Sequence, residues 1–405
     1  MMRLLIFQYG NYHETLERRQ QGLPETYRAQ YYSLDCIDKV AGSGRCMVVC
    51  LDAEPHDIQV GNYHLIGDRF QPQSKGFLYT LDVNRSARRL LSIAKKFAPT
   101  HIIVRTPGWV LQRVGRWAVQ NNVHLLPVLA DLFYHKGMKD RFRNRALIQL
   151  LNHPHIKMVA NHNYPACESM AAAGVDAEKI VAYDWPVIRS PETSQEKFLD
   201  PPKGPVRLVF VGQVSEAKGA CDLFEAGVEL DRSGYRIAID YFGDGEELGH
   251  LERLNEKMGL GDQIKFHGLT PNQMVMEAMR AADLVIVPSR HEYPEGLPCV
   301  IYESFETRTP LICSDHPSFL PRLKEGLGCR IFRAGDSHSL ALAIKELIDA
   351  PDVYAEMSKS TIDAWKNIQC PVTFGEMISQ WISWTQSGAD IPCLEQNLKK
   401  AAVYA

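Results

Sequence analysis

Short apolar segments alternate with amphipathic ones in this chain, in two series that a polar, proline-rich stretch separates. Strands that alternate with helices form parallel sheets with helices on both faces. In the first series we expect strands over Arg3–Gln8, Arg45–Leu51, His101–Arg105, His124–Leu129 and Lys157–Asn161, and helices over Tyr27–Val40, Ser86–Phe97, Val110–Asn121 and Tyr164–Ala173. In the second we expect strands over Val206–Gly212, Arg236–Phe242, Gln263–His267, Asp283–Pro288, Pro310–Ser314 and Arg330–Phe332, and helices including Met274–Ala281 and Ser337–Asp349.

The stretch 189–205 is rich in proline and polar residues, as linkers are. A chain of 405 residues also exceeds the size of one ordinary core. We therefore predict an α/β architecture of two Rossmann-like, doubly wound domains, over residues 1–190 and 206–370, with a linker over 191–205. A helical tail over 371–405 is expected to pack back on the first domain. Ligands of such sheets bind beyond the carboxyl ends of the strands, so we expect the two domains to face a cleft.

The composition excludes several classes of protein. The net charge of −3 gives no global attraction to nucleic acid. No apolar run approaches the roughly 20 residues that cross a bilayer, and the apolar start reads as a strand, too short for a signal peptide. The ten cysteines are scattered, without zinc spacing. These features predict a cytoplasmic protein with reduced cysteines.

Two glutamates, Glu295 and Glu303, lie on either side of a predicted helix start that follows the strand Asp283–Pro288. Free N–H groups at a helix start favour negative charge, and each carboxylate can accept two hydroxyl hydrogen bonds. A nucleotide sugar has both an anionic diphosphate and many hydroxyls. The stretch therefore predicts a nucleotide-sugar site, although Glu303 alone is more often one of several exposed helix glutamates.

Three further signals each follow a strand of the second series. A glycine permits close backbone approach, and a lysine can place a cation on a diphosphate. The signals are Gly212-Gln213 with Lys218-Gly219, Gly243-Asp244-Gly245, and His267-Gly268. In this order, together with the glutamate pair, they resemble the nucleotide-binding domain of the GT-B retaining glycosyltransferases of family 4, over roughly residues 206–320.

The resemblance implies roles for single residues. Lys218 would hold the donor diphosphate, Glu295 would face the transferred sugar, and Glu303 would bond ribose hydroxyls. The other donor-binding residues that it implies are Gly212, Gln213, Gly245, Gly296, Leu297 and, through its backbone, His267. The family usually has arginine where this chain has Gln213, so half of the phosphate clamp is missing. Lys218 as a solvated surface lysine and Gly243-Asp244-Gly245 as a purely structural turn remain alternatives.

The first series departs from the family. Where many members carry a histidine, this chain has Ala130, followed by Asp131 and later by His135. Arg105 ends the preceding strand, and three roles stay open: a cation for the donor phosphates, recognition of an anionic acceptor, or an ion pair with Asp131. The basic run 136–145 is either an acceptor or membrane-surface patch, or a solvated helix face. We expect residues 9–25 to form a long loop.

The resemblance implies transfer of a sugar from a UDP- or GDP-sugar to a hydroxyl acceptor such as a glycan or a lipid-linked saccharide, with retention of anomeric configuration. Glu295, Lys218, Asp131 and Arg105 form the expected catalytic set. No metal or other cofactor is expected, no nucleic acid, and peripheral membrane contact is possible. The alternatives are a degenerate protein that binds nucleotide or a partner without transfer, or a nucleotide-sugar epimerase or hydrolase.

Overall fold

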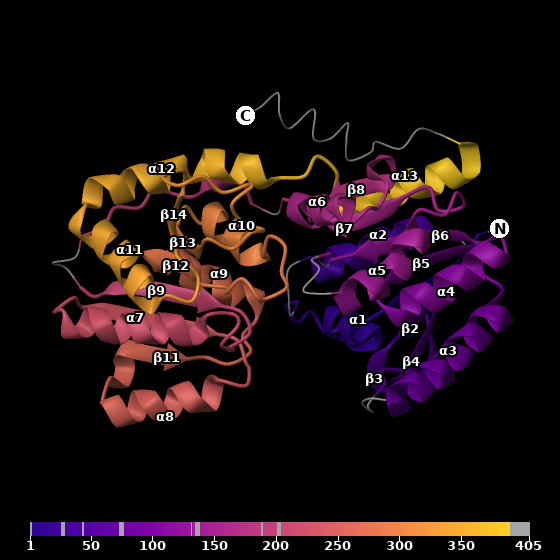
Figure 1. Ribbon diagram of the computed structural model, residues 1–405, viewed down its shortest axis with the longest axis horizontal. Coiled ribbons are helices and arrows are strands. Elements are labelled where there is room, and N and C mark those ends of the chain that lie inside the picture. The colour runs from indigo at the N-terminus through magenta and orange to yellow at the C-terminus, as the bar shows by residue number, and fades with distance from the viewer. Residues whose placement is uncertain are drawn as a thin grey trace. The chain divides into compact units, whose positions relative to one another are not determined.

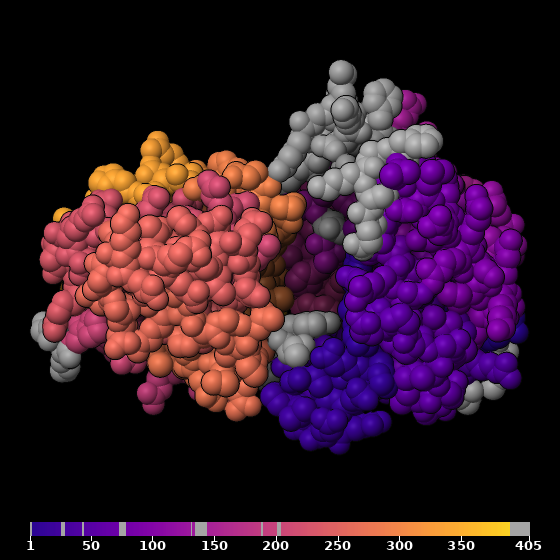
Figure 2. Space-filling view, turned by 90° about the horizontal axis from the view of Figure 1, so that it is seen from below, coloured from indigo at the N-terminus to yellow at the C-terminus, as the bar shows by residue number. Residues whose placement is uncertain are grey.

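The computed structural model describes residues 2–25, 29–42, 44–72, 77–130, 132–133, 138–187, 189–200 and 204–388. Contacts divide the chain into two compact units. The first contains the described residues up to Pro186 and those from Cys370, and the second extends from Val187 to Gln369. The colours along the chain separate accordingly, with indigo and purple on one unit and salmon and orange on the other (Figures 1 and 2).

The first unit contains an eight-stranded sheet in the order β3-β4-β2-β1-β5-β6-β7-β8. Its strand pairs are parallel except β3 with β4, which form an antiparallel hairpin. This hairpin and β8 were not predicted. The strands are β1 (Arg3–Gln8), β2 (Arg45–Cys50), β3 (Asp52–Val60), β4 (Tyr63–Arg69), β5 (His101–Arg105), β6 (His124–Leu129), β7 (Val159–His162) and β8 (Ile180–Tyr183).

Helices cover both faces of this sheet. Neighbouring strand residues point to opposite sides, so the sheet has an apolar face on each side that a helix layer buries. Leu5 and Phe7 face one buried cluster, while Leu4 and Ile6 face the other. The first cluster is completed by α3 (Phe77–Phe97), α4 (Trp109–Gln120), α5 (Met138–Leu151) and α6 (Tyr164–Ala172). The second is completed by α1 (Tyr12–Gln20), α2 (Gln30–Ala41) and α13 (Phe374–Ser387). A short 3-10 turn, η1 (Ala177–Lys179), precedes β8.

The expectation of a long loop over residues 9–25 is wrong, because this segment contains α1. Asn11 caps the helix by accepting a hydrogen bond from the backbone N–H of Glu14 at 3.2 Å. Helix α13 begins with a capping box, in which Thr373 and Glu376 satisfy each other's backbone N–H groups. This cap starts the helix immediately after the chain returns to the first unit.

The second unit contains a six-stranded parallel sheet in the order β11-β10-β9-β12-β13-β14. Its strands are β9 (Val206–Val211), β10 (Ile237–Phe242), β11 (Ile264–Phe266), β12 (Leu284–Val287), β13 (Leu311–Ser314) and β14 (Cys329–Phe332). One face packs on α7 (Ala220–Arg232), α8 (Leu248–Met258) and α11 (Ser337–Asp349). The other packs on α9 (Asn272–Ala281), α10 (Cys299–Glu306) and the end of α12 (Pro351–Ile368). The described part of the unit also contains the 3-10 turns η2 (Pro191–Thr193) and η4 (Gly261–Gln263).

The described part of the segment 191–205, which we predicted as a linker, packs on the second unit. The ammonium of Lys197 donates to the carbonyl oxygens of Met279 and Ala282, at 2.9 and 2.5 Å, and to Oγ1 of Thr309 at 2.7 Å. Burial lowers the pKa of Lys197 to about 7. Because carbonyls at a helix C-terminus favour a cation, Lys197 anchors this segment to the end of α9.

No helix in the described part of the chain is both long enough and apolar enough to cross a membrane.

Candidate functional site

Glycines allow close backbone packing of the loops at the carboxyl ends of β9 and β10. Gly212 has φ of +146° and Gly243 has φ of +137°, conformations that favour glycine. A Cβ at position 243 would lie 1.9 Å from the carbonyl oxygen of Gly212, and one at position 245 would lie 2.3 Å from that of Val214. The two loops therefore pack backbone against backbone, which brings both strand ends close to the segment that carries Lys218.

Lys218 and Glu295 form an ion pair between this segment and the loop after β12. Lys218 is buried and Glu295 is partly buried, with exposed side-chain fractions of 6% and 13%. The ammonium also lies 5.0 Å from the centre of the Tyr293 ring. Oε1 of Glu295 is buried and accepts no hydrogen bond from any residue that the structure describes. Because a buried polar atom without a partner is costly, this oxygen is an acceptor in need of a donor.

A buried histidine fixes the loop that carries Glu295. Nδ1 of His316 accepts a hydrogen bond from the N–H of Ser318 at 3.2 Å, so its Nε2 carries the proton and donates to the carbonyl of Tyr293 at 3.0 Å. Burial lowers the pKa of His316, which favours this neutral form. Our sequence reasoning missed His316. The available signal was its position two residues after the end of β13.

Arg290, in the loop after β12, links this loop to α7 and to the segment before it. Its guanidinium donates to both carboxylate oxygens of Asp222, at 3.0 and 2.7 Å, and to Glu216 at 2.7 Å. Hydrogen bonding to Asp222 raises the pKa of Arg290. Because three of its nitrogens already donate to carboxylates, Arg290 does not replace the arginine that the family carries at position 213.

The structure places the other predicted residues of this half as follows. Gln213 is exposed, and its Oε1 accepts from the Tyr293 hydroxyl at 3.4 Å. Gly296 and Leu297 are buried in the loop before α10. Glu303 is 3% exposed and accepts from Nδ2 of Asn272 at 2.8 Å. The interpretation of Glu303 as an exposed helix glutamate is therefore wrong.

His267 is held on the second sheet. Its Nε2 lies 2.7 Å from Oδ1 of Asp240, and its ring stacks on Phe242 at a centroid distance of 4.4 Å. We had expected the backbone of His267 to contribute to the site, and its N–H donates to the carbonyl of Tyr241 at 2.9 Å. That group therefore has a structural partner already.

In the first unit, Arg105 lies at the carboxyl end of β5. It donates to Oε1 of Gln8 at 3.2 Å and to Oγ of Ser33 at 3.1 Å, and it lies 4.9 Å from the centre of the Phe374 ring. These partners are neutral, so the charge of Arg105 is not paired by them. Asp131 and His135 lie outside the described residues.

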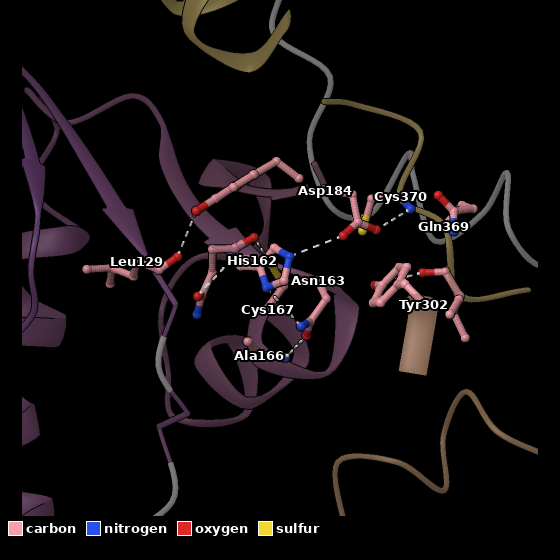
Figure 3. Close-up of polar contacts among 12 residues, drawn as sticks. Leu129, His162, Asn163, Ala166, Cys167, Asp184, Tyr302, Gln369 and Cys370 are labelled. Atoms are coloured by element: carbon pink, nitrogen blue, oxygen red, sulfur yellow. Dashed lines mark hydrogen bonds and ion pairs between the residues drawn. The ribbon is translucent and has the colours of Figure 1, made fainter. Parts of the chain in front are cut away.

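A second polar cluster of the first unit surrounds Asp184, directly after β8 (Figure 3). Nε2 of His162 lies 3.2 Å from Oδ1 of Asp184, and the N–H of Cys370 donates to Oδ2 at 3.0 Å. The backbone of Asp184 also donates to Val372 at 3.0 Å and accepts from Phe374 at 2.9 Å. Asp184 thus fastens the returning chain to the strand from which the chain left. This cluster was not predicted.

Residues 192–364 match the family model described as Glycosyl transferases group 1. This region is a domain of the glycosyl transferases group 1 family. It contains Lys218, Glu295 and Glu303, the residues around which the candidate site is built. The loops that contain Gly212 and Gly243, and the Lys218–Glu295 ion pair, are therefore features of the group 1 domain.

Curated relatives carry glycosyltransferase names. D-inositol 3-phosphate glycosyltransferase 2 of Catenulispora acidiphila is 24% identical over 222 residues, 51% of each chain. The 2-deoxystreptamine glucosyltransferase of Streptomyces kanamyceticus is 26% identical over 41% of this chain and 42% of its own. This chain thus spans about half the length of these two relatives. The amylovoran biosynthesis glycosyltransferase AmsK of Erwinia amylovora is 22% identical over 71% of this chain and 80% of its own.

Solved structures share the architecture of the whole chain. Anabaena Alr3699/HepE in complex with UDP and glucose has a TM-score of 0.65 and 16% identity, over 96% of this chain and all of that one. Sucrose-phosphate synthase from Thermosynechococcus elongatus has a TM-score of 0.66 and 14% identity, over 96% of this chain. The chain has the GT-B fold, with two parallel-sheet α/β units, the first of which adds the antiparallel strand β3 at its edge.

Proposed function

We propose that this protein transfers a sugar from a UDP- or GDP-sugar to a hydroxyl acceptor, in the synthesis of a glycan, glycolipid or polysaccharide. The observation that carries the proposal is the Lys218–Glu295 pair at the carboxyl edge of a parallel sheet in the group 1 domain, where the buried Oε1 of Glu295 accepts no hydrogen bond from the described residues. Ligands of open α/β sheets bind at this edge.

Each part of the donor has a candidate partner in the second unit. Lys218 would turn from Glu295 to the diphosphate, where a cation is worth most when water is excluded. Oε1 of Glu295 would accept a sugar hydroxyl, and Glu303 a ribose hydroxyl. The amide of Gln213, the backbone around Gly296 and Leu297, and the turn at Gly212 and Gly245 would complete the contacts.

The chemistry that follows is electrostatic. Stabilised charge on the departing diphosphate lowers the barrier to cleavage of the glycosidic bond. The leaving phosphate would then accept the proton of the acceptor hydroxyl on the same face, so that the anomeric configuration is retained. Positive charge comes from Lys218 and from the start of α10, so the proposal includes no metal. Arg105 would bind either the donor phosphates or an anionic acceptor, and Asp131 stays a candidate catalytic residue.

One observation favours a second candidate, a protein that binds a nucleotide sugar without transferring the sugar. Gln213 takes the place of an arginine, and each nitrogen of the nearby Arg290 guanidinium already donates to Asp222 or Glu216. A site with one cation stabilises a leaving diphosphate less than a site with two. The two candidates differ in whether sugar reaches an acceptor.

The first experiment is a thermal-shift panel of UDP-, GDP- and ADP-sugars, followed by calorimetry with the nucleoside diphosphate of the best donor. The variant Lys218→Ala should weaken nucleotide binding by about 1.5–3 kcal/mol, the range for hydrogen bonds to charged groups. Lys257→Ala, which removes an exposed lysine on α8, is the matched control and should bind like the wild type. Equal affinity of Lys218→Ala and wild type would remove Lys218 from the donor site. Tight binding without turnover toward any acceptor would favour the second candidate.

A further inference from the structure

The first turns of α3 expose large apolar side chains. Leu78, Tyr79 and Leu81 have exposed fractions of 60, 43 and 50%. The same helix buries Val83 and Leu90 in the core of the first unit, so its inward face is already filled. The exposed leucines are therefore an addition to the outward face of the helix, and not a part of the core left open.

Cations continue this outward face along the helix. Spacings of three and four residues place Leu78, Leu81, Arg85 and Arg88 in one stripe. Farther along α3, three more exposed cations follow: Arg89, Lys95 and Lys96. The only acidic residue in α3 is Asp82, whose carboxylate lies 3.9 Å from Arg85.

Carboxylates neutralise only part of this charge. Arg89 pairs with Asp68 and lies 4.6 Å from the centre of the Phe70 ring. For Arg88, Lys95 and Lys96, the described residues supply no carboxylate within ion-pair distance. Arg88, Lys95 and Lys96 thus have no carboxylate partner among the described residues and can bind an external anion.

Helix α4 packs beside α3 and extends the basic surface (Figure 1). It exposes Arg113 and Arg116 and contains no acidic residue. Arg113 donates to Oδ1 of Asn84 on α3 at 2.8 Å, which ties the two helices together. We call the exposed residues of α3 and α4 the α3–α4 surface. Its basic character contrasts with the net charge of −3 of the whole chain.

We propose that the α3–α4 surface docks on an anionic lipid bilayer. Helices that lie in a membrane interface combine a polar face rich in Lys and Arg with exposed leucines and aromatic residues. Anionic headgroups would bind the arginines and lysines, while Leu78 and Leu81 would enter the boundary with the acyl chains. A nucleic acid or an acidic protein would satisfy the cations and leave the leucines in water, so the bilayer is the partner that uses the whole surface.

The docking is peripheral and reversible, because each cation near an anionic surface contributes only modestly. It is also independent of the proposed sugar transfer, since the surface lies on the helices of the first unit and the donor-site residues lie in the second. The two proposals can therefore fail separately. Together they would describe an enzyme that works on acceptors at a membrane surface.

Sedimentation of the full chain with vesicles of phosphatidylcholine, with and without phosphatidylglycerol, tests the proposal. We expect binding to the anionic vesicles only, weakened at high salt because screening shortens the reach of the charges. The double variant Arg85→Ala/Arg88→Ala should lower the partition coefficient by more than about twentyfold, from about fivefold per cation. Leu78→Ser/Leu81→Ser should lower it by about tenfold or more, through lost apolar burial.

The matched control is Arg253→Ala/Lys257→Ala, which removes two exposed cations from α8 and should leave vesicle binding unchanged. Circular dichroism and thermal-shift responses to the donor should be equal in all variants, which separates this test from that of the donor site. Absence of binding to anionic vesicles, or an equal loss in the α8 control, would overturn the proposal. Stronger binding to an RNA homopolymer, insensitive to the leucine variant, would do so in favour of a nucleic-acid partner.

Discussion

The carboxyl edges of the two sheets use their polar side chains differently. In the second unit, Lys218 and Glu295 form an ion pair, and Oε1 of Glu295 is buried without a hydrogen-bond partner among the described residues. In the first unit, Asp184 contacts His162 through one carboxylate oxygen and accepts from the N–H of Cys370 through the other, while its backbone pairs with Val372 and Phe374. The same edge of the same kind of sheet thus holds a carboxylate oxygen without a partner among the described residues in one unit, and a carboxylate with a contact at each oxygen in the other.

The difference teaches which polar groups serve ligands and which serve the fold. A polar group that binds a substrate lacks one hydrogen-bond partner when the substrate is absent, and this lowers the stability of the free domain. A group that joins distant segments is most stabilising when every bond is made. Replacing Glu295 should therefore harm activity more than stability, and replacing Asp184 should do the reverse.

The largest effect is expected for Glu295→Ala. Because Glu295 is proposed to accept a hydrogen bond from the transferred sugar, its loss should lower transfer at least about 100-fold, the scale for a lost electrostatic contact in a transition state, while the melting temperature stays near that of the wild type. Transfer is measured as the release of nucleoside diphosphate in the presence of an acceptor. Glu256→Ala, on the exposed face of α8, is the control with unchanged rate. Wild-type turnover by Glu295→Ala would remove the distinction between the two edges.

The comparison also explains what the sequence could reveal. Strands β1, β5 and β6 begin and end where we predicted, because each is an apolar run bounded by polar residues. The candidate site of the second unit could be predicted from the sequence for the same reason. Its glycines, Lys218 and the glutamates follow strand ends within short segments, so local patterns carry them.

The misses have physical causes too. Strand β3 contains Pro55 and several acidic residues, which a sheet tolerates only at an edge, and this composition hid the hairpin. Helix α1 is so polar that its sequence resembles a loop. The Asp184 cluster depends on residues 370–374 meeting a strand that ends near residue 183. No local pattern encodes a contact over that sequence distance.

A smaller effect, on stability, is expected for Asp184→Ala. This substitution leaves the N–H of Cys370 without its carboxylate acceptor, and hydrogen bonds to charged groups are worth about 1.5–3 kcal/mol. The urea midpoint of the first unit, followed by tryptophan fluorescence, should fall accordingly. Asp35→Ala breaks an exposed ion pair with Arg19 in the same unit and should cost less than about 1 kcal/mol. Equal costs for the two variants would show that Asp184 does not fasten the returning chain.

The smallest predicted effect is on the pH dependence of stability. It concerns one buried histidine in each unit, His101 in the first and His316 in the second. Burial lowers the pKa of His101 to about 4 and also lowers that of His316. His101 is buried between Oγ1 of Thr100, at 2.8 Å, and Oγ1 of Thr385, at 3.0 Å, with the His124 ring 4.9 Å and the Trp381 ring 5.4 Å away.

Since the unfolded chain takes up a proton near pH 6.5 and the folded chain only near pH 4 at this position, its contribution to stability is present above pH 6.5 and is lost as the pH falls toward 4. In His101→Gln, the urea midpoint of the first unit should decline less steeply over this range, while that of the second unit keeps its slope through His316. An unchanged slope in the first unit would mean that protonation of His101 does not contribute to the loss of its stability in acid.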